Sequence, residues 1–99
     1  MRFSEKVLQK VSEIPRGKVS TYKALARACG SPRAARAVGN ALNSNPNLIK
    51  VPCHRVVCFD GRIGGYAFGR GKKAMLLRSE GLEIRDSRIE GLESALFRF

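Results

Sequence analysis

The chain has 99 residues, 43% of them hydrophobic and 27% charged, which fits one folded domain and excludes a second full domain. Nineteen lysines and arginines against eight acidic residues give a net charge of +11, which favours a polyanionic partner, either nucleic acid or an anionic membrane surface. No apolar run reaches the length of a membrane span and the N-terminus does not resemble a secretory signal, so we expect an intracellular protein, located in the cytoplasm or nucleoid of a prokaryote or the nucleus of a eukaryote.

The first predicted helix begins at Ser4 as its N-cap and ends before Pro15 and Gly17. Phe3 and Leu8 stand at the positions of a hydrophobic staple. The apolar face of this helix consists of Val7, Leu8, Val11 and Ile14.

Two further helices are predicted on either side of a tight turn. Thr21 caps a helix over residues 22–29, and Gly30 stands where a left-handed residue ends it. Ser31 then caps a helix over residues 32–43. Two short helices joined in this way predict a helix-turn-helix.

The helix predicted over residues 32–43 divides into three faces when each residue is placed at about 100° per step. The stripe expected in the core consists of Ala35, Val38 and Leu42. The polar face consists of Arg33, Arg36 and Asn40, and a strip of small residues consists of Ala34, Ala37 and Ala41. A basic face beside small residues allows close approach to DNA. An ordinary solvated helix with surface arginines explains the same pattern, and the whole-chain charge favours the DNA interpretation.

The second half of the chain predicts smaller elements. A turn-rich loop occupies residues 43–47, a hairpin is expected over residues 54–63 around Asp60 and Gly61, and a glycine-rich loop covers residues 64–71. A short helix follows over residues 72–79, and a capping box formed by Ser87 and Glu90 predicts a helical tail. The fold class expected is mainly α with a small β-hairpin, a winged helix-turn-helix-like DNA-binding domain, with residues 1–99 as a single domain.

The three cysteines are an odd number and predict free thiols rather than disulfides. A metal site is not expected, because His54 is the only histidine and no C-x-x-C pair occurs. Cys29 and Cys58 lie in apolar patterns that fit buried packing. Cys53 is followed by His54 and by Arg55, and the positive charge of Arg55 would favour a thiolate. The residues therefore leave two possibilities open for Cys53: a buried hydrophobe or a nucleophile. On an extended strand His54 would face away from Cys53, so it could assist only if the backbone turns there or a water relays the proton.

Six stretches decide between these possibilities: "IPRGKVSTYKALA", "SPRAARAVGNAL", "NSNPN", "VPCHRVV", "GGY" and "KKAMLLRSEG". Their order and spacing resemble the catalytic, DNA-binding domain of the O6-alkylguanine-DNA alkyltransferases, from about residue 14 to residue 81. Residues 82–99 lie outside the resemblance. Full-length members usually carry an additional N-terminal domain, and the present sequence begins almost directly at the catalytic one.

The resemblance implies a role for each catalytic position. Cys53 would take the alkyl group from O6 of a damaged guanine, and His54 would deprotonate the thiol through a water, oriented by Glu80. Tyr22 would hand a proton to the departing base and crowd the DNA phosphate. Asn45 would brace the turn before the active site. The product is a thioether that nothing in this sequence could remove, so one molecule would repair one lesion, with no metal or organic cofactor.

The resemblance also implies how DNA is held. The damaged nucleotide must leave the duplex to meet a thiol, and Arg36 would fill the gap while the helix of residues 32–43 enters the minor groove. The expected DNA-binding residues are Tyr22, Arg33, Ala34, Arg36, Ala37, Gly39 and Asn40. The expected walls of the base pocket are Val56, Gly64, Gly65, Tyr66 and Ala67. The partner is double-stranded DNA containing O6-alkylguanine, bound by a monomer, with cooperative binding possible and no membrane partner.

Two departures bear on the range of alkyl groups. Leu48 stands where several members have a proline, and "YAFG" replaces the usual small residues after the tyrosine. Two other classes of function stay open: an alkyltransferase-like protein that binds the lesion without transfer, whose members commonly have tryptophan in place of the motif cysteine, and a plain helix-turn-helix DNA binder with a structural Cys53. The retained cysteine argues against the first of these, and the set of matching site residues argues against the second.

Overall fold

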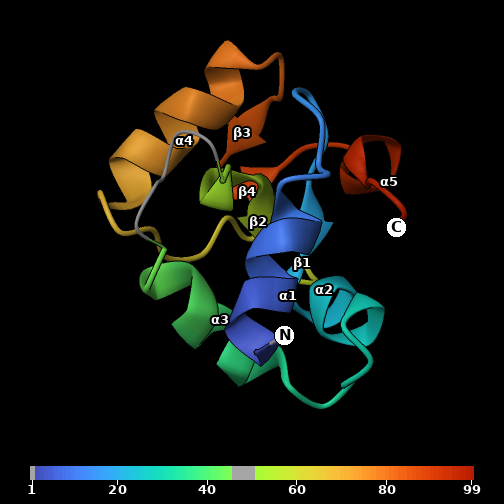
Figure 1. Ribbon diagram of the computed structural model, residues 1–99. Helices are drawn as coiled ribbons and strands as arrows, with labels where there is room; N and C mark the ends of the chain where they lie inside the picture. The colour runs from blue at the N-terminus through green and yellow to red at the C-terminus, as the bar shows by residue number, and fades with distance from the viewer. Residues whose placement is uncertain (1, 46–50) are drawn as a thin grey trace.

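The computed structural model describes residues 2–45 and 51–99 (Figure 1). The described helices are α1 (Phe3–Val11), α2 (Tyr22–Ala28), α3 (Ala35–Asn43), the 3-10 helix η1 (Cys53–Arg55), α4 (Arg70–Ser79) and α5 (Leu92–Ala95). The described strands are β1 (Ser20–Thr21), β2 (Val56–Val57), β3 (Ile84–Arg85) and β4 (Arg88–Ile89). The fold is mainly helical with small strands, as predicted, and none of its described helices is long and apolar enough to cross a membrane.

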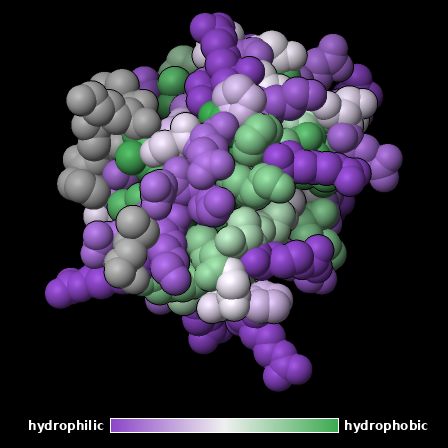
Figure 2. All heavy atoms as spheres, turned by 45° about the vertical axis from the view of Figure 1, so that its right-hand side comes forward, coloured by the Kyte–Doolittle hydropathy of each residue, from purple (hydrophilic) through white to green (hydrophobic). Residues whose placement is uncertain are grey.

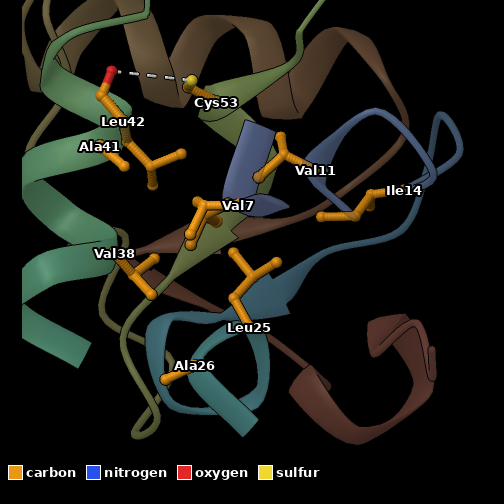
Figure 3. Close-up of a cluster of buried hydrophobic side chains, with 10 residues drawn as sticks. Val7, Val11, Ile14, Leu25, Ala26, Val38, Ala41, Leu42 and Cys53 are labelled. Carbon is orange, nitrogen blue, oxygen red and sulfur yellow. Dashed lines mark hydrogen bonds between the residues drawn. The ribbon is translucent and has the colours of Figure 1, made fainter. Parts of the chain in front are cut away.

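Helices α1, α2 and α3 pack together around the main core, which Figure 3 shows in close-up. Its buried members are Val7, Val11, Ile14, Leu25, Ala26, Val38, Ala41, Leu42, Cys53 and Val56. Helix α1 begins one residue before the predicted cap Ser4, because the backbone amide of Arg2 donates to Oε1 of Glu5 at 3.4 Å and so closes the first turn earlier. The predicted apolar face is confirmed at Val7, Val11 and Ile14, whereas Leu8 is only half-buried.

Helices α2 and α3 form the predicted helix-turn-helix, but the connection between them covers residues 29–34 and is longer than the tight turn predicted. Oγ1 of Thr21 accepts from the amide of Ala24 at 3.0 Å, which confirms the predicted cap of α2, and Gly30 has a left-handed φ of +81°. Helix α3 starts at Ala35, three residues later than predicted. Ser31 accepts instead through its backbone carbonyl, from the amide of Ala34 at 2.9 Å, which closes a turn before the helix.

The structure corrects the faces that were expected for α3. Arg33 lies in the turn rather than on the helix, and Ala34 is the N-cap. Ala41, expected in the strip of small residues, is buried in the core, while Ala35, expected in the core, is half-buried. The buried face is therefore centred on Val38, Ala41 and Leu42, toward α1.

The strands pair differently from the prediction. Strand β2 runs parallel to β1, with Ser20 opposite Val56 and Thr21 opposite Val57. The C-terminal segment lies along the start of β1, where Val19 donates to the carbonyl of Ala95 and accepts from the amide of Phe97, both at 2.8 Å. A second core of Val19, Val57, Ile63, Leu77, Ile89 and Ala95 lies between these segments and α4.

The predicted hairpin over residues 54–63 is wrong in its strands, although the turn exists: Cys58 donates to the carbonyl of Arg62 at 2.8 Å. The hairpin of this fold is formed by β3 and β4 instead. Asp86 and Ser87 both have positive φ, 52° and 60°, which is the geometry of a tight two-residue hairpin turn. Ser87 consequently cannot cap a helix, and the predicted helical tail is reduced to the four residues of α5.

Helices α2 and α5 lie on the right-hand side of Figure 1. Figure 2 turns this side toward the viewer and shows hydrophobic residues gathered between hydrophilic ones. A groove on this side is lined by residues of α2, by Phe59 and by the C-terminal segment with Phe97 and Phe99. Phe59 and Phe99 are both exposed. The groove lies apart from the cavity that holds Cys53, because the two share no lining residue.

Candidate active site

A cavity of about 400 Å³ lies between the start of α2, helix α3 and the loop before α4. It is lined by Tyr22, Ala35, Arg36, Gly39, Asn40, Leu42, Asn43, Cys53, Gly65, Tyr66 and Ala67. This volume falls within the range of pockets that bind small organic molecules. The cavity therefore joins a cysteine, a tyrosine and an arginine that the sequence had singled out separately.

Cys53 is the first residue of η1 and is 5% exposed. Its Sγ accepts a hydrogen bond from Nδ2 of Asn45 at 2.8 Å, and its thiol faces the carbonyl oxygen of Leu42 at 3.9 Å (Figure 3). Burial raises the pKa of the Cys53 thiol, and the Asn45 amide and the Lys73 charge offset only part of that effect. The resting cysteine is thus a protonated thiol that a base must activate.

On an extended strand His54 would face away from Cys53, but the backbone turns at this point because the two residues lie in η1. Its Nε2 lies 2.9 Å from Oε2 of Glu80, and Arg55 binds the same carboxylate through Nη2 at 2.7 Å and Nε at 3.0 Å. Burial raises the pKa of Glu80, but the hydrogen bonds from Arg55 and His54 outweigh it, so the net pKa is lowered and the group is a carboxylate.

In a neutral imidazole, a carboxylate at Nε2 places the ring proton on that nitrogen. The other nitrogen, Nδ1, is then the basic one. It is buried and has no hydrogen-bond partner in the described part of the chain. The described hydrogen bonds of Cys53 Sγ go to Asn45 and Leu42 rather than to His54, so proton transfer between thiol and imidazole would pass through a relay.

Tyr22 stands at the first position of α2 and projects into the cavity. Burial raises the pKa of its phenol, as do the neighbouring Cys58 and Cys53, so the hydroxyl keeps its proton and can donate it. Gly64 lies directly behind it with φ of +75°, and a Cβ there would lie 3.3 Å from the tyrosine hydroxyl oxygen. The positive φ favours glycine at this position, and the contact with Tyr22 leaves little room for a side chain.

Lys73 belongs to this site and was missed from the sequence. The side chain is 1% exposed, and its Nζ donates to the carbonyl oxygens of Val56 at 2.6 Å and Gly65 at 3.1 Å. Burial lowers the pKa of Lys73 to about 8, although the neighbouring Cys58 and Cys53 act in the opposite direction. One signal could have revealed it: Lys73 precedes the buried Leu77 by one helical turn, so the two share the inward face of α4.

The structure brings most of the predicted site residues to this cavity. Those that line it are Tyr22, Arg36, Gly39, Asn40, Cys53, Gly65, Tyr66 and Ala67. Asn45 donates a hydrogen bond to Cys53, and Glu80 binds His54, the residue that follows Cys53 in η1. Of the remaining predictions, Val56 and Gly64 are not among the lining residues, Arg33 lines a neighbouring cavity, and Ala34 and Ala37 line neither. Leu48, expected to affect the pocket, lies outside the described residues.

The described residues contain no group of three His, Cys, Asp or Glu side chains that could hold a metal ion. Cys29, Cys53 and Cys58 are free thiols.

Comparison with known proteins agrees with this geometry. Residues 2–82 match the family model of the 6-O-methylguanine DNA methyltransferase DNA-binding domain. The methylated-DNA--protein-cysteine methyltransferase of Methanosarcina barkeri is 47% identical over 83 residues, 84% of this chain and 52% of that protein. The protein of the same name from Homo sapiens is 46% identical over 80 residues, 80% of this chain and 39% of that protein. The chain thus spans about half the length, or less, of these relatives.

Two solved structures are also similar. Atl1 of S. pombe in complex with damaged DNA containing O6-carboxymethylguanine has a TM-score of 0.86 at 35% identity, covering 99% of each chain. OGT of Mycobacterium tuberculosis in complex with DNA has a TM-score of 0.79 at 41% identity, covering 82% of this chain and 49% of that one. The family match, the relatives and the cysteine-containing cavity lead to one conclusion: the chain belongs to the 6-O-methylguanine DNA methyltransferase family.

Proposed function

We propose that this protein repairs DNA by transferring the alkyl group of an O6-alkylguanine irreversibly to Cys53, once per molecule. The observation that carries the proposal is the position of Cys53 in a cavity with Tyr22 and Arg36, backed by the His54–Glu80 pair. The names of the relatives, methylated-DNA--protein-cysteine methyltransferases, support the same chemistry.

The transfer is a displacement at a saturated carbon. His54 takes the thiol proton through a water, and the Cys53 thiolate attacks the alkyl carbon, so that a C–S bond forms as the C–O6 bond breaks. The guanine leaves with the bonding electron pair and accepts a proton from the Tyr22 hydroxyl. The resulting thioether has no bond that water can readily cleave, so the protein is consumed stoichiometrically and needs no cofactor.

Access to the thiol requires that the damaged nucleotide leave the base stack. Helix α3 would lie in the minor groove, where Gly39 and the exposed Ala37 permit close approach of its backbone. Arg36 is exposed on α3 and lines the cavity, a position from which it can replace the flipped base in the stack. The net charge of +11 supplies attraction to the phosphates. The proposed partner is therefore duplex DNA, bound by a monomer.

A second candidate is a lesion-binding protein that performs no transfer. The likeness to Atl1, which covers 99% of both chains and includes the C-terminal segment, favours it. The cysteine at position 53 favours transfer, since the non-transferring proteins that the sequence resembles commonly carry tryptophan there.

Intact-protein mass spectrometry separates the two candidates. The protein is incubated with a duplex that contains a single O6-methylguanine and is then mapped by peptide. Transfer predicts a gain of one methyl group on Cys53 that saturates at one per molecule, is lost in Cys53→Ser and persists in the control Cys58→Ser. Tight binding to the same duplex without any gain in mass would favour the lesion-binding candidate.

A further inference from the structure

The groove between α2 and the C-terminal segment has a volume of about 550 Å³ and lies on the side that Figure 2 turns toward the viewer. Its lining is mostly apolar and includes Ala24 and Ala28 of α2, Leu96, Phe59 and Phe99. Among the described residues four large hydrophobic side chains are exposed, and two of them line this groove: Phe59 is 72% exposed and Phe99 is 41% exposed. Exposed apolar side chains that gather in a hollow are typical of a site that binds another molecule.

The aromatic wall of the groove is held in place by the rest of the fold. Phe97 and Phe99 pack edge to face with their ring centres 5.2 Å apart, and Nζ of Lys10 lies 6.0 Å from the centre of the Phe99 ring. The amide of Phe97 also donates to the carbonyl of Val19 at 2.8 Å. This wall lies beyond residue 82, where the match to the family model ends. The groove is therefore formed in part by a segment outside the region that the family model covers.

The charged side chains that line the groove are two arginines, Arg27 on α2 and Arg98 beside Phe99 in the sequence. Both are exposed, and neither takes part in an ion pair of the described residues. A guanidinium can bind a carboxylate through two parallel hydrogen bonds. A mostly apolar groove with two unpaired arginines therefore fits a peptide that presents an apolar side chain together with carboxylates.

We propose that this groove binds an acidic peptide segment of a partner protein. An aromatic or aliphatic side chain of that segment packs against Phe59 and Phe99. Carboxylates of the same segment pair with Arg27 and Arg98. The groove shares no lining residue with the cavity that holds Cys53, so a partner bound here leaves that cavity open, and the proposal does not depend on alkyl transfer.

Two other occupants fit the groove less well. A second copy of the chain would bring a further net charge of +11 and the same two arginines, so the two copies would repel each other. Duplex DNA would place phosphates against an aromatic wall, and no residue of α3 lines the groove. An acidic peptide matches both the apolar lining and the positive charge.

The test uses a phage-displayed library of random dodecapeptides, selected on the wild-type protein. Enriched peptides are labelled with fluorescein, and their affinities are measured by fluorescence anisotropy. We expect them to combine Asp or Glu with an aromatic or aliphatic residue. Phe99→Ser and Arg98→Ala should each weaken the binding by about tenfold or more, as the loss of a central contact in an interface does.

Met75→Ser and Arg70→Ala are the matched controls, because each removes an exposed side chain of the same kind from α4, outside the groove. They should leave the affinity for the peptides unchanged. Failure to enrich any peptide, enrichment of peptides without acidic residues, or an equal loss of affinity in groove and control variants would overturn the proposal.

The same variants test the other two occupants. An affinity for duplex DNA that falls in Phe99→Ser and not in Met75→Ser would assign the groove to DNA. A dimer in sedimentation velocity that Phe99→Ser dissociates and Met75→Ser does not would assign the groove to a second copy. Either result would show the proposal to be wrong, whereas a monomer with unchanged duplex affinity in Phe99→Ser is the result expected for a peptide site.

Discussion

Nδ2 of Asn45 lies 2.8 Å from Sγ of Cys53 and donates to the carbonyl of Val51 at 3.0 Å. This one amide therefore connects the segment that follows α3 to the residues that lead into η1. It also brings a hydrogen-bond donor to a buried sulfur atom. A donor of this kind stabilises a thiolate more than a thiol, so Asn45 affects both the position and the ionisation of Cys53.

Replacement of Asn45 by alanine should slow the alkylation of Cys53. The amide hydrogen bond lowers the pKa of Cys53 against the effect of burial, so its loss raises that pKa and reduces the thiolate fraction at neutral pH. We expect the iodoacetamide rate at Cys53 to fall by about tenfold, the size of effect that loss of a hydrogen bond to a charged group produces. Ser44→Ala is the matched control, because the exposed Ser44 hydroxyl binds only the carbonyl of Asn40 among its described contacts. Equal rates in the two variants would contradict the role of Asn45.

The interaction of Glu80 with His54 and Arg55 should make the free energy of unfolding depend on pH in the acid range. The pKa of Glu80 is lower in the folded protein than its ordinary value of about 4, because Arg55 and His54 stabilise the carboxylate. A lowered folded pKa contributes stability that is fully present above the unfolded pKa and is lost as the pH falls through the folded one. Urea unfolding should accordingly show a loss of stability below about pH 4.

The variant Glu80→Gln removes that titrating group. It should be less stable than the wild type at neutral pH, since Arg55 and His54 lose the carboxylate, and the difference between the two proteins should shrink as the pH falls below about 4. Glu83→Gln is the control, on an exposed side chain. A stability difference that stays constant over the acid range would show that folding does not lower the pKa of Glu80.

The sequence predicted side-chain caps at both Thr21 and Ser31, whereas the structure has one only at Thr21, and the free energy of unfolding distinguishes the two. Thr21→Ala should lower the free energy of unfolding by about 1 kcal/mol, because Thr21 Oγ1 accepts the amide hydrogen of Ala24. Ser31→Ala should have a much smaller effect, since the amide of Ala34 binds the backbone carbonyl of Ser31, which the substitution retains. Equal losses in the two variants would mean that Ser31 caps α3 in solution after all.

Local patterns predicted the helical part of the fold well. The spacing of Val7, Val11 and Ile14 indicated the buried face of α1, and Thr21 and Gly30 marked the limits around α2 correctly. The strands were harder, because each has only two residues and its partner is distant in the chain: β2 pairs with β1 across more than thirty residues. The tail was misread because Ser87 and Glu90 fit a capping box, while the positive φ of Asp86 and Ser87 depends on pairing with the rest of the molecule.

The candidate site was predicted largely through the family resemblance. Composition and spacing alone left Cys53 as either filler or nucleophile, and the structure places it with Tyr22 and Arg36 around one cavity. Lys73 was not singled out from the sequence, although it precedes Leu77 by one helical turn, because a lysine beside another lysine in a basic chain also fits a solvated surface. Its burial follows from the packing of α4 against η1 and the second core, which only the folded chain establishes.

Arg36→Ala should separate DNA engagement from the chemistry at sulfur. Arg36 is exposed on α3, whereas Cys53 receives its described hydrogen bond from Asn45, so the thiol should react with iodoacetamide at the wild-type rate. Methyl transfer from an O6-methylguanine duplex should fall by about tenfold or more, because a side chain that fills the stack offsets part of an unstacking cost of a few kcal/mol.

The matched control is Arg85→Ala, which removes an exposed arginine that pairs with Glu90 from β3, outside the cavity that Arg36 lines. Since both variants lower the net charge equally, a general loss of attraction to phosphate should affect them alike. A deficit confined to Arg36→Ala, and absent with a single-stranded substrate whose base is already unstacked, would assign Arg36 to nucleotide flipping. An equal deficit in both variants would show that Arg36 acts only through its contribution to the net positive charge of the protein.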